Sequence, residues 1–423
     1  MMTSERNYKE AFVWIWLPDE TEPVIAGKLE VYNRNIMFNY GKSYLERIAD
    51  IKPAISIYEP ELPLKAGVLQ LLEGLSMPGC IRDAAPDAWG RRVIINKILG
   101  LKGEGADTAE LGELIYLLES GSDRIGALDF QRSPTEYLPR LAGHVDLDEL
   151  LQSVERVEKG IPLTPELDLA LFRGSSIGGA RPKALIEEQG VKYVAKFSSS
   201  NDLYSVVKAE FIAMRLASLV GLDVAPVKMA KAANKDVLLV ERFDRKREQA
   251  GWSRKTLVSA LTLFALDEMM ARYASYEILA EIIRHRFIDP KKNLRELFSR
   301  LVFNILCGNT DDHARNHAAF WNGGELSLTP AYDICPQGRA GNVASQAMLI
   351  SGSNNHSHIK NCLETAHNFL LYEDDAREIF TRQKVVIEQN WDSVCNEAQL
   401  SDIDRKYLWK RQFLNPYSID VWS

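Results

Sequence analysis

Long hydrophobic runs and paired cysteines are both absent from this 423-residue chain. No stretch approaches the roughly 18 consecutive apolar residues that a membrane-spanning helix needs. The polar start of the chain lacks the apolar core of a secretory signal peptide. The five cysteines are scattered without a CxxC pair, and their odd number does not suit a disulfide framework. We therefore expect a reduced, cytoplasmic protein with no membrane segment.

An excess of positive charge is also lacking, because 58 acidic residues outnumber 51 basic ones and the formal net charge is −7. Binding to nucleic acid depends on neutralising phosphates, so a chain this acidic is a poor general nucleic-acid binder unless a local patch or a basic partner brings it there. The length suggests two or three domains. The hydrophobic fraction of 46% is ample for a large core.

Two strands are predicted near the start of the chain, at Phe12–Leu17 and Gly27–Tyr32, from an apolar run and an alternating pattern. The stretch Pro86–Arg92 suggests no chemistry, and we interpret it as a packing or domain-contact element. An acidic helix or linker is expected within residues 140–160.

A Gly-rich stretch at residues 174–180 precedes a predicted β-hairpin made of Ala184–Ile186 and Val191–Phe197. Apolar residues at helical spacing then predict a helix over Ala209–Val220, which Gly221 ends. Val237–Val240 has the composition of a short buried strand. Beyond it the hydrophobic pattern is helical almost throughout.

The most informative region extends from Leu294 to Asp333. An unbroken apolar stripe predicts a helix over Leu294–Leu306, ended by Gly308 and Asn309. A polar loop follows, with Asp311 and Asn316 five residues apart. Asn322-Gly323-Gly324 is a strong hairpin turn between two apolar strands, and the return strand leads to Asp333.

Phosphoryl transfer of the protein-kinase type needs this set of groups. One carboxylate orients the acceptor hydroxyl and accepts its proton, while an amide and a second carboxylate hold Mg²⁺ against the ATP phosphates. The step from Asp311 to Asn316 equals that of a kinase catalytic loop. Asp311 is therefore the candidate base, and Asn316 and Asp333 are the candidate Mg²⁺ ligands. The alternative is a solvated connection, since this spacing is common in surface loops.

Candidate phosphate-binding groups lie upstream in the order that a kinase requires. Lys196 is on the second hairpin strand, where it can reach the α- and β-phosphates, and Glu210 on the next helix is its candidate partner. Lys183 is not a Walker A lysine, because Pro182 precedes it and Ala184 follows it. A surface charge is the plainer interpretation of each residue alone, so the prediction depends on their order.

A zinc site is the rival interpretation of the same loop. His313 and His317 are four residues apart, with Asp311 and Asp312 beside them. The region lacks an HExxH motif, and a strand begins near His317, so the two histidines do not share a helix face. A structural role for His313 is the simpler interpretation.

These motifs together resemble the HipA family of bacterial serine/threonine kinase toxins. The segments that carry the resemblance are Asn309–Asn316, Thr329–Ile334, Ser176–Lys183, Glu241–Arg245, Ala26–Leu29 and Pro86–Arg91. They span nearly the whole chain in one order. The resemblance implies an α+β, atypical two-lobed protein-kinase-like fold with a β-rich N-terminal subdomain and an all-α C-terminal lobe. It divides the chain into an N-terminal subdomain (1–140), a nucleotide-binding part with the Gly-rich loop (141–245) and a mostly helical lobe with the catalytic loop (246–423).

The resemblance also implies roles for individual residues, with ATP and Mg²⁺ as the cofactors. Asp311 would be the catalytic base, and Asn316 and Asp333 would bind Mg²⁺. Lys196 and the Gly-rich loop, including Gly178 and Gly179, would contact ATP phosphates. The backbone of Glu241 and Phe243 would hold adenine, with Asp244 near the ribose. Ser176 aligns with the serine that the family autophosphorylates, and the neighbouring Ser175 leaves that assignment open.

Partners and targets follow from the resemblance alone. The family implies a toxin that arrests growth by phosphorylating a translation-related protein, glutamyl-tRNA synthetase being the best-known target. A HipB-like helix-turn-helix antitoxin would neutralise it and bring it to operator DNA. Two alternatives stay open: a kinase-like corepressor that acts through antitoxin and DNA, and a small-molecule kinase.

Overall fold

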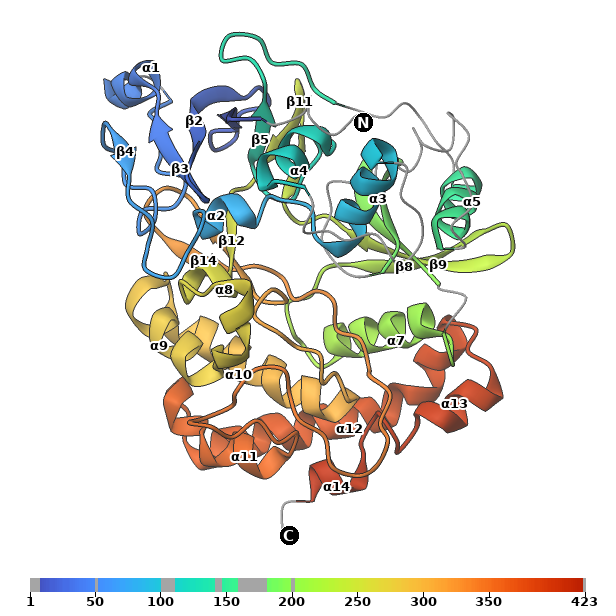
Figure 1. Ribbon diagram of the computed structural model, residues 1–423. Coiled ribbons are helices and arrows are strands. Elements are labelled where there is room, and N and C mark those ends of the chain that lie inside the picture. The colour runs from blue at the N-terminus through green and yellow to red at the C-terminus, as the bar shows by residue number, and fades with distance from the viewer. Residues whose placement is uncertain are drawn as a thin grey trace. The chain divides into compact units, whose positions relative to one another are not determined.

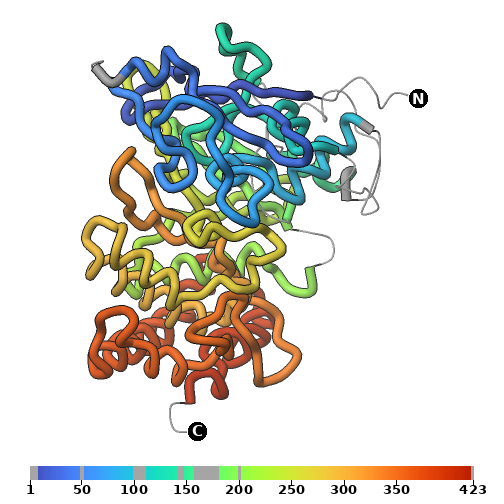
Figure 2. The backbone as a smooth tube through the Cα atoms, turned by 60° about the vertical axis from the view of Figure 1, so that its left-hand side comes forward, coloured from blue at the N-terminus to red at the C-terminus, as the bar shows by residue number. Residues whose placement is uncertain are grey.

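The computed structural model describes residues 8–49, 52–99, 111–140, 147–158, 181–198 and 202–420 (Figure 1). The chain divides into two compact units. Unit 1 comprises Met1–Ser199, Ala230–Val258 and Trp321–Gly324, and unit 2 comprises Ser200–Met229, Ser259–Phe320 and Glu325–Ser423. Figure 2 shows the course of the backbone through both units. Among the described residues, no helix combines the length and apolarity that a membrane crossing requires.

Unit 1 begins with a five-stranded sheet in the order β4-β3-β2-β1-β5. Its strands are β1 (Glu10–Ile15), β2 (Val24–Tyr32), β3 (Asn35–Tyr40), β4 (Val68–Leu69) and β5 (Leu128–Gln131). The two strands predicted from the apolar run and the alternating pattern are therefore present, as β1 and β2. Gly27 lies where β2 and β3 approach closely, because a Cβ there would be 2.2 Å from the backbone oxygen of Asn39.

A second sheet of unit 1 has the order β6-β7-β9-β8 and contains the predicted hairpin. Its strands are β6 (Lys183–Glu188), β7 (Val191–Phe197), β8 (Val227–Ala232) and β9 (Lys235–Glu241). Short elements complete the unit: α1 (Lys42–Leu45), η1 (Glu46–Ala49), α2 (Gly79–Arg82), α3 (Ala88–Leu99), α4 (Glu113–Glu119), α5 (Leu147–Glu158), β10 (Arg245–Glu248), β11 (Gly251–Arg254) and β12 (Leu257–Ser259).

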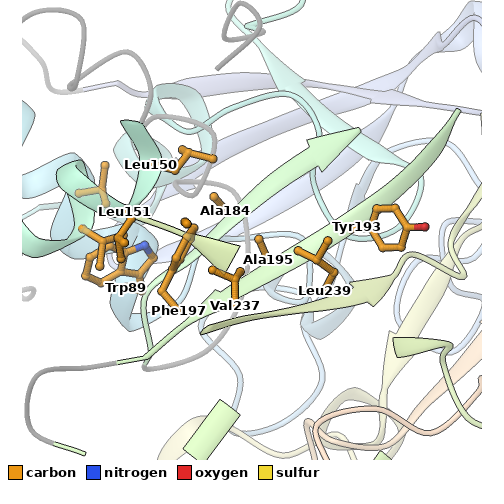
Figure 3. Close-up of a cluster of buried hydrophobic side chains, with 12 residues drawn as sticks. Trp89, Leu150, Leu151, Ala184, Tyr193, Ala195, Phe197, Val237 and Leu239 are labelled. Atoms are coloured by element: carbon orange, nitrogen blue, oxygen red, sulfur yellow. The ribbon is translucent and has the colours of Figure 1, made fainter. Parts of the chain in front are cut away.

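Helices α3 and α5 bury their apolar side chains against this second sheet. Trp89 from α3 and Leu151 from α5 lie beside Phe197 and Val237 in one buried hydrophobic cluster (Figure 3). The indole of Trp89 is 1% exposed. The Pro86–Arg92 stretch is therefore a packing element, as we interpreted it, and its Arg91 makes a two-bonded ion pair with Glu113 at 2.7 and 2.6 Å.

Unit 2 is built mainly of helices. These are α7 (Val206–Leu219), α8 (Ala260–Leu263), η5 (Glu268–Tyr273), α9 (Tyr276–Arg286), α10 (Pro290–Cys307), α11 (Ile359–Glu364), η6 (Ala366–Phe369), α12 (Glu373–Glu397), α13 (Asp402–Leu408) and α14 (Pro416–Ile419). Helix α10 is the centre of the unit, because its predicted apolar stripe is fully buried and packs against α9, α11 and α12. Gly308 ends it in a left-handed conformation at φ 73°.

The predicted hairpin after the polar loop of Asp311 and Asn316 is also present, as β13 (Ala318–Trp321) and β14 (Leu326–Leu328). The C-terminal part is thus mostly helical and includes this short hairpin. The observed mixture of helices and antiparallel sheets agrees with the predicted α+β class. The division at residues 140 and 245 stays a prediction.

Candidate functional site

The polar loop between α10 and β13 brings its two predicted functional residues together. Asp311 is exposed, and Asn316 is buried at the other end of the loop. The side-chain Nδ2 of Asn316 donates a hydrogen bond to the backbone oxygen of Asp311 at 3.3 Å. The loop therefore folds back on itself, so that the candidate base and a candidate metal ligand are neighbours.

A buried hydrogen-bond network anchors this loop to the core helices α9 and α10. The carboxylate of Asp312 accepts a hydrogen bond from Nε2 of His317 at 2.9 Å and another from the hydroxyl of Tyr276 on α9. Asn304 on α10 donates to the same hydroxyl at 3.4 Å and accepts from Asn309 at 3.0 Å. The two ends of the loop are thereby fixed to each other and to two core helices.

The electrostatics of Asp312 show that the network favours its charged form. Burial by itself would raise the pKa of the Asp312 carboxyl, but His317 and the hydrogen bonds from His317 and Tyr276 outweigh burial and hold that pKa below its usual range. The side chain of His317 is 3% exposed. This engagement of Nε2 explains His317 as a structural partner of Asp312, whereas the zinc alternative needs it as a ligand beside His313.

Asp333 lies close to the same loop in a conformation that few non-glycine residues adopt. Its φ is 59°, in the left-handed region. The hydroxyl of the preceding Tyr332 donates to the backbone oxygen of Arg315 at 2.7 Å, which ties this segment to the same polar loop. Partial burial, followed by the charges of Asp333 and Asp312, raises the pKa of Asp311, and His313 opposes the shift. Unit 2 therefore assembles Asp311, Asn316 and Asp333 in one place.

The oxygen ligands offered by Asp311, Asn316 and Asp333 suit a hard divalent cation. Carboxylate and amide oxygens are the ligands that Mg²⁺ takes in nucleotide-dependent enzymes. A cation beside Asp311 and Asp333 would also relieve the mutual repulsion of their carboxylates. No cluster of three His, Cys, Asp or Glu side chains suited to a metal occurs in the described parts of the chain. A Mg²⁺ held by Asn316 and Asp333 would therefore need further oxygens, such as nucleotide phosphates.

Two buried lysines face each other on the second sheet of unit 1. Lys196 on β7 is the cross-strand partner of Lys183 on β6, and their exposed fractions are 6% and 7%. Cross-strand partners lie on the same face of a sheet, and like charges in that position repel each other. The sequence pattern indicates Lys196 but not Lys183 as a phosphate contact, because only the strand register places the two side by side.

The segment after β9 holds the residues expected at the adenine and ribose. Glu241 ends β9, and Phe243 is half-buried. Asp244 is 2% exposed, and its carboxylate accepts hydrogen bonds from the guanidinium groups of Arg242 and Arg245 and from the backbone N–H of Gly126 at 2.8 Å. Both carboxylate oxygens are thus engaged within unit 1, and the ribose role of Asp244 stays a prediction.

The remaining candidates are not placed by the structure. Ser176, Gly178 and Gly179 of the Gly-rich loop, together with Ser175, lie outside the described residues. Lys196 belongs to unit 1 and Glu210 to unit 2, so their expected ion pair stays a prediction.

Replacement of His317 by leucine should destabilise unit 2. The substitution leaves the buried carboxylate of Asp312 without its main charge partner, which costs about 2–4 kcal/mol of unfolding free energy. Urea denaturation followed by helical circular dichroism would measure the loss. The matched control is His285→Leu, which removes the exposed pair of His285 with Glu281 and should change stability by less than about 0.5 kcal/mol. Equal effects of the two substitutions would contradict a structural role for His317.

Comparison with known proteins gives consistent matches. Residues 175–391 match the family model of the HipA-like C-terminal domain. The protein Y4mE of Sinorhizobium fredii, which is named as a kinase, is 26% identical over 300 residues, covering 65% of this chain and 69% of the relative. The serine/threonine-protein kinase toxin HipA of Shewanella oneidensis is 27% identical over 186 residues, covering 38% of this chain and 42% of the relative.

A solved structure is similar over almost the full length. The complex of HipA, HipB and operator DNA from Shewanella oneidensis contains a chain that matches with a TM-score of 0.67 at 20% identity, covering 96% of this chain and 95% of that one. At this identity the likeness establishes the fold. The predicted α+β, kinase-like fold is therefore confirmed.

Proposed function

The chain belongs to the family of proteins with a HipA-like C-terminal domain, and from that premise we propose that it is a Mg²⁺- and ATP-dependent serine/threonine protein kinase. The observation that carries the proposal is the assembly of Asp311, Asn316 and Asp333 around one anchored loop of unit 2. These are the base and the two metal ligands that phosphoryl transfer of the kinase type requires.

The proposed roles follow from the chemistry of each group. Asp311 orients a seryl or threonyl hydroxyl and accepts its proton while the γ-phosphoryl group of ATP is transferred to that oxygen and ADP leaves. Asn316 and Asp333 would hold Mg²⁺, which would supply the positive charge that neutralises the phosphates. Lys196, with Lys183 beside it, binds phosphate oxygens of the nucleotide. The backbone of Glu241 and Phe243 recognises the adenine base, with Asp244 on the ribose side.

Regulation and biological role complete the proposal. The kinase acts as the toxin of a HipBA-like toxin–antitoxin module and arrests growth by phosphorylating a translation-related protein such as glutamyl-tRNA synthetase. A HipB-like antitoxin neutralises it and brings it to operator DNA. Autophosphorylation of Ser176 in the Gly-rich loop would place about −1.5 to −2 units of charge where anionic ATP binds, and thereby inactivate the enzyme.

The proposal is tested by incubating the purified chain with γ-labelled ATP and Mg²⁺, alone and with a bacterial lysate. We expect label on Ser176 and on one lysate protein, and we expect chelation of Mg²⁺ to abolish both signals. Label on a metabolite but on no protein would replace the proposal by a small-molecule kinase. Tight ATP binding with no transfer to any acceptor would replace it by a kinase-like corepressor.

A further inference from the structure

A cluster of buried and half-buried charges in unit 1 contacts the segment proposed to recognise adenine. Asp123 is at its centre. One carboxylate oxygen of Asp123 accepts hydrogen bonds from Arg242 at 2.9 Å and from Arg245 at 2.9 and 3.1 Å, and the other accepts from Lys192 at 2.6 Å. The guanidinium groups of Arg242 and Arg245 are each 1% exposed. One carboxylate therefore holds three cations: Lys192 of β7, Arg242 just after β9, and Arg245 at the start of β10.

Asp123 belongs to the segment Ser122–Gly126, and backbone groups of this segment also bond to residues 242–245. The backbone oxygen of Arg124 accepts hydrogen bonds from both Arg242 and Arg245, the former at 2.6 Å. The backbone oxygen of Gly126 accepts from Arg245 at 2.9 Å, and its N–H donates to Asp244 at 2.8 Å. Ser122–Gly126 is thus bonded to residues 242, 244 and 245, between the end of β9 and the start of β10.

The charges in this cluster are energetically coupled. Burial alone would raise the pKa of the Asp123 carboxyl, but Arg242, Arg245 and Lys192 outweigh it and hold that pKa well below the usual range. The same competition lowers the pKa of Asp244 to about 2. Loss of one partner from a buried ion pair leaves an uncompensated charge, which is costly, so the geometry of the cluster is strongly enforced.

The segment between β9 and β10 connects this cluster to the proposed adenine contact. The chain turns at Phe243 and Asp244, and the side chains of Arg242, Asp244 and Arg245 all enter the cluster. Glu241 and Phe243 flank Arg242 directly, so their backbone is fixed by the same contacts. The backbone is held as well, because the N–H of Arg242 donates to Lys192 at 2.9 Å and the oxygen of Asp244 accepts from Lys255 at 3.0 Å.

We propose that Asp123 is a positioning residue for nucleotide recognition, through which the segment Ser122–Gly126 sets the backbone of Glu241–Phe243 against the adenine base. The inference rests on the proposed function and assigns a further residue to it. We call Glu241–Phe243 the hinge. The segment Ser122–Gly126 lies some 120 residues upstream of it, outside the region matched to the HipA-like C-terminal domain, and becomes a determinant of base recognition. Asp123 itself touches neither base nor phosphate.

The test compares nucleotide binding by the full chain with Asp123→Asn and with wild type. Two ligands are used: ATP and inorganic tripolyphosphate, which has the phosphates without the base. If Asp123 positions the adenine contact, the substitution should weaken ATP binding about tenfold and leave tripolyphosphate binding within about twofold, because only the base depends on the hinge backbone. The KM for ATP should rise by a similar factor while kcat stays within about threefold.

Two further variants separate positioning from general damage. Asp123→Asn with Lys192→Met removes the central carboxylate and one cation together, so the net charge of the cluster is unchanged and folding is protected, and it should show the same selective loss. Glu113→Gln breaks the ion pair with Arg91 elsewhere in unit 1 and should bind both ligands as wild type does.

Three results would overturn the inference. Unchanged ATP binding by a folded Asp123 variant would show that the hinge does not depend on the cluster. Equal weakening of ATP and tripolyphosphate would indicate a general structural role. Failure of the wild type itself to bind ATP would remove the proposed function together with this inference, and it is recognised without any variant.

Discussion

Replacement of Asp311 by asparagine should lower the rate of phosphoryl transfer by about 10²–10⁴-fold, because loss of a positioned general base costs that much. The substitution should leave the loop folded. The hydrogen bond that Asn316 donates reaches the backbone oxygen of Asp311, and the loop is anchored by Asp312 and His317. Initial rates with labelled ATP at saturating Mg²⁺ would measure the effect.

A matched control for this experiment is Asp402→Asn. Asp402 is an exposed carboxylate at the start of α13 in the same unit, so its loss changes the net charge equally without touching the catalytic loop. Its transfer rate should equal that of the wild type. Retention of more than about a tenth of the wild-type rate by Asp311→Asn would contradict the assignment of Asp311 as the base.

Replacement of Trp89 by alanine should reduce the stability of unit 1 by about 3–5 kcal/mol, the usual cost of deleting a fully buried large aromatic side chain. The indole lies among Val93, Leu151, Phe197 and Val237, and the cavity left behind would lie between α3, α5 and the second sheet (Figure 3). Hydrogen exchange followed by mass spectrometry resolves the two units. Peptides from β7 should exchange faster by the corresponding factor, whereas peptides from α10 should be unaffected.

Trp89→Phe is the informative companion to this variant. The indole N–H of Trp89 has no hydrogen-bond partner among the described residues, so phenylalanine keeps most of the ring while removing a buried, unsatisfied donor. We expect a loss below about 1.5 kcal/mol. If the alanine and phenylalanine variants lost similar amounts of unfolding free energy, packing of the aromatic ring would not be the way in which α3 stabilises unit 1.

The local elements and the order of the functional residues were determined by the sequence itself. Apolar spacing alone specifies α10, because its stripe can be buried only on a helix, and Gly308 ends it through a left-handed conformation. Turn chemistry specifies the hairpin of β13 and β14. The step from Asp311 to Asn316 is a local property of one loop, and the structure confirms that the two residues meet. These features depend on neighbours within about 20 residues, which a pattern can describe.

Contacts between distant segments were decided only by the tertiary structure. Asp123 and Arg242 are 119 residues apart, and nothing in the spacing of either indicates that one carboxylate holds three cations. Lys183 joins Lys196 only through the register of β6 with β7, since a shift of one residue would turn one side chain to the other face. The carboxylate of Asp312 differs from that of Asp311 only through burial against Tyr276 and His317. Burial and strand register arise when separate elements pack, so they determine which of two adjacent aspartates is anchored in the core and which remains exposed.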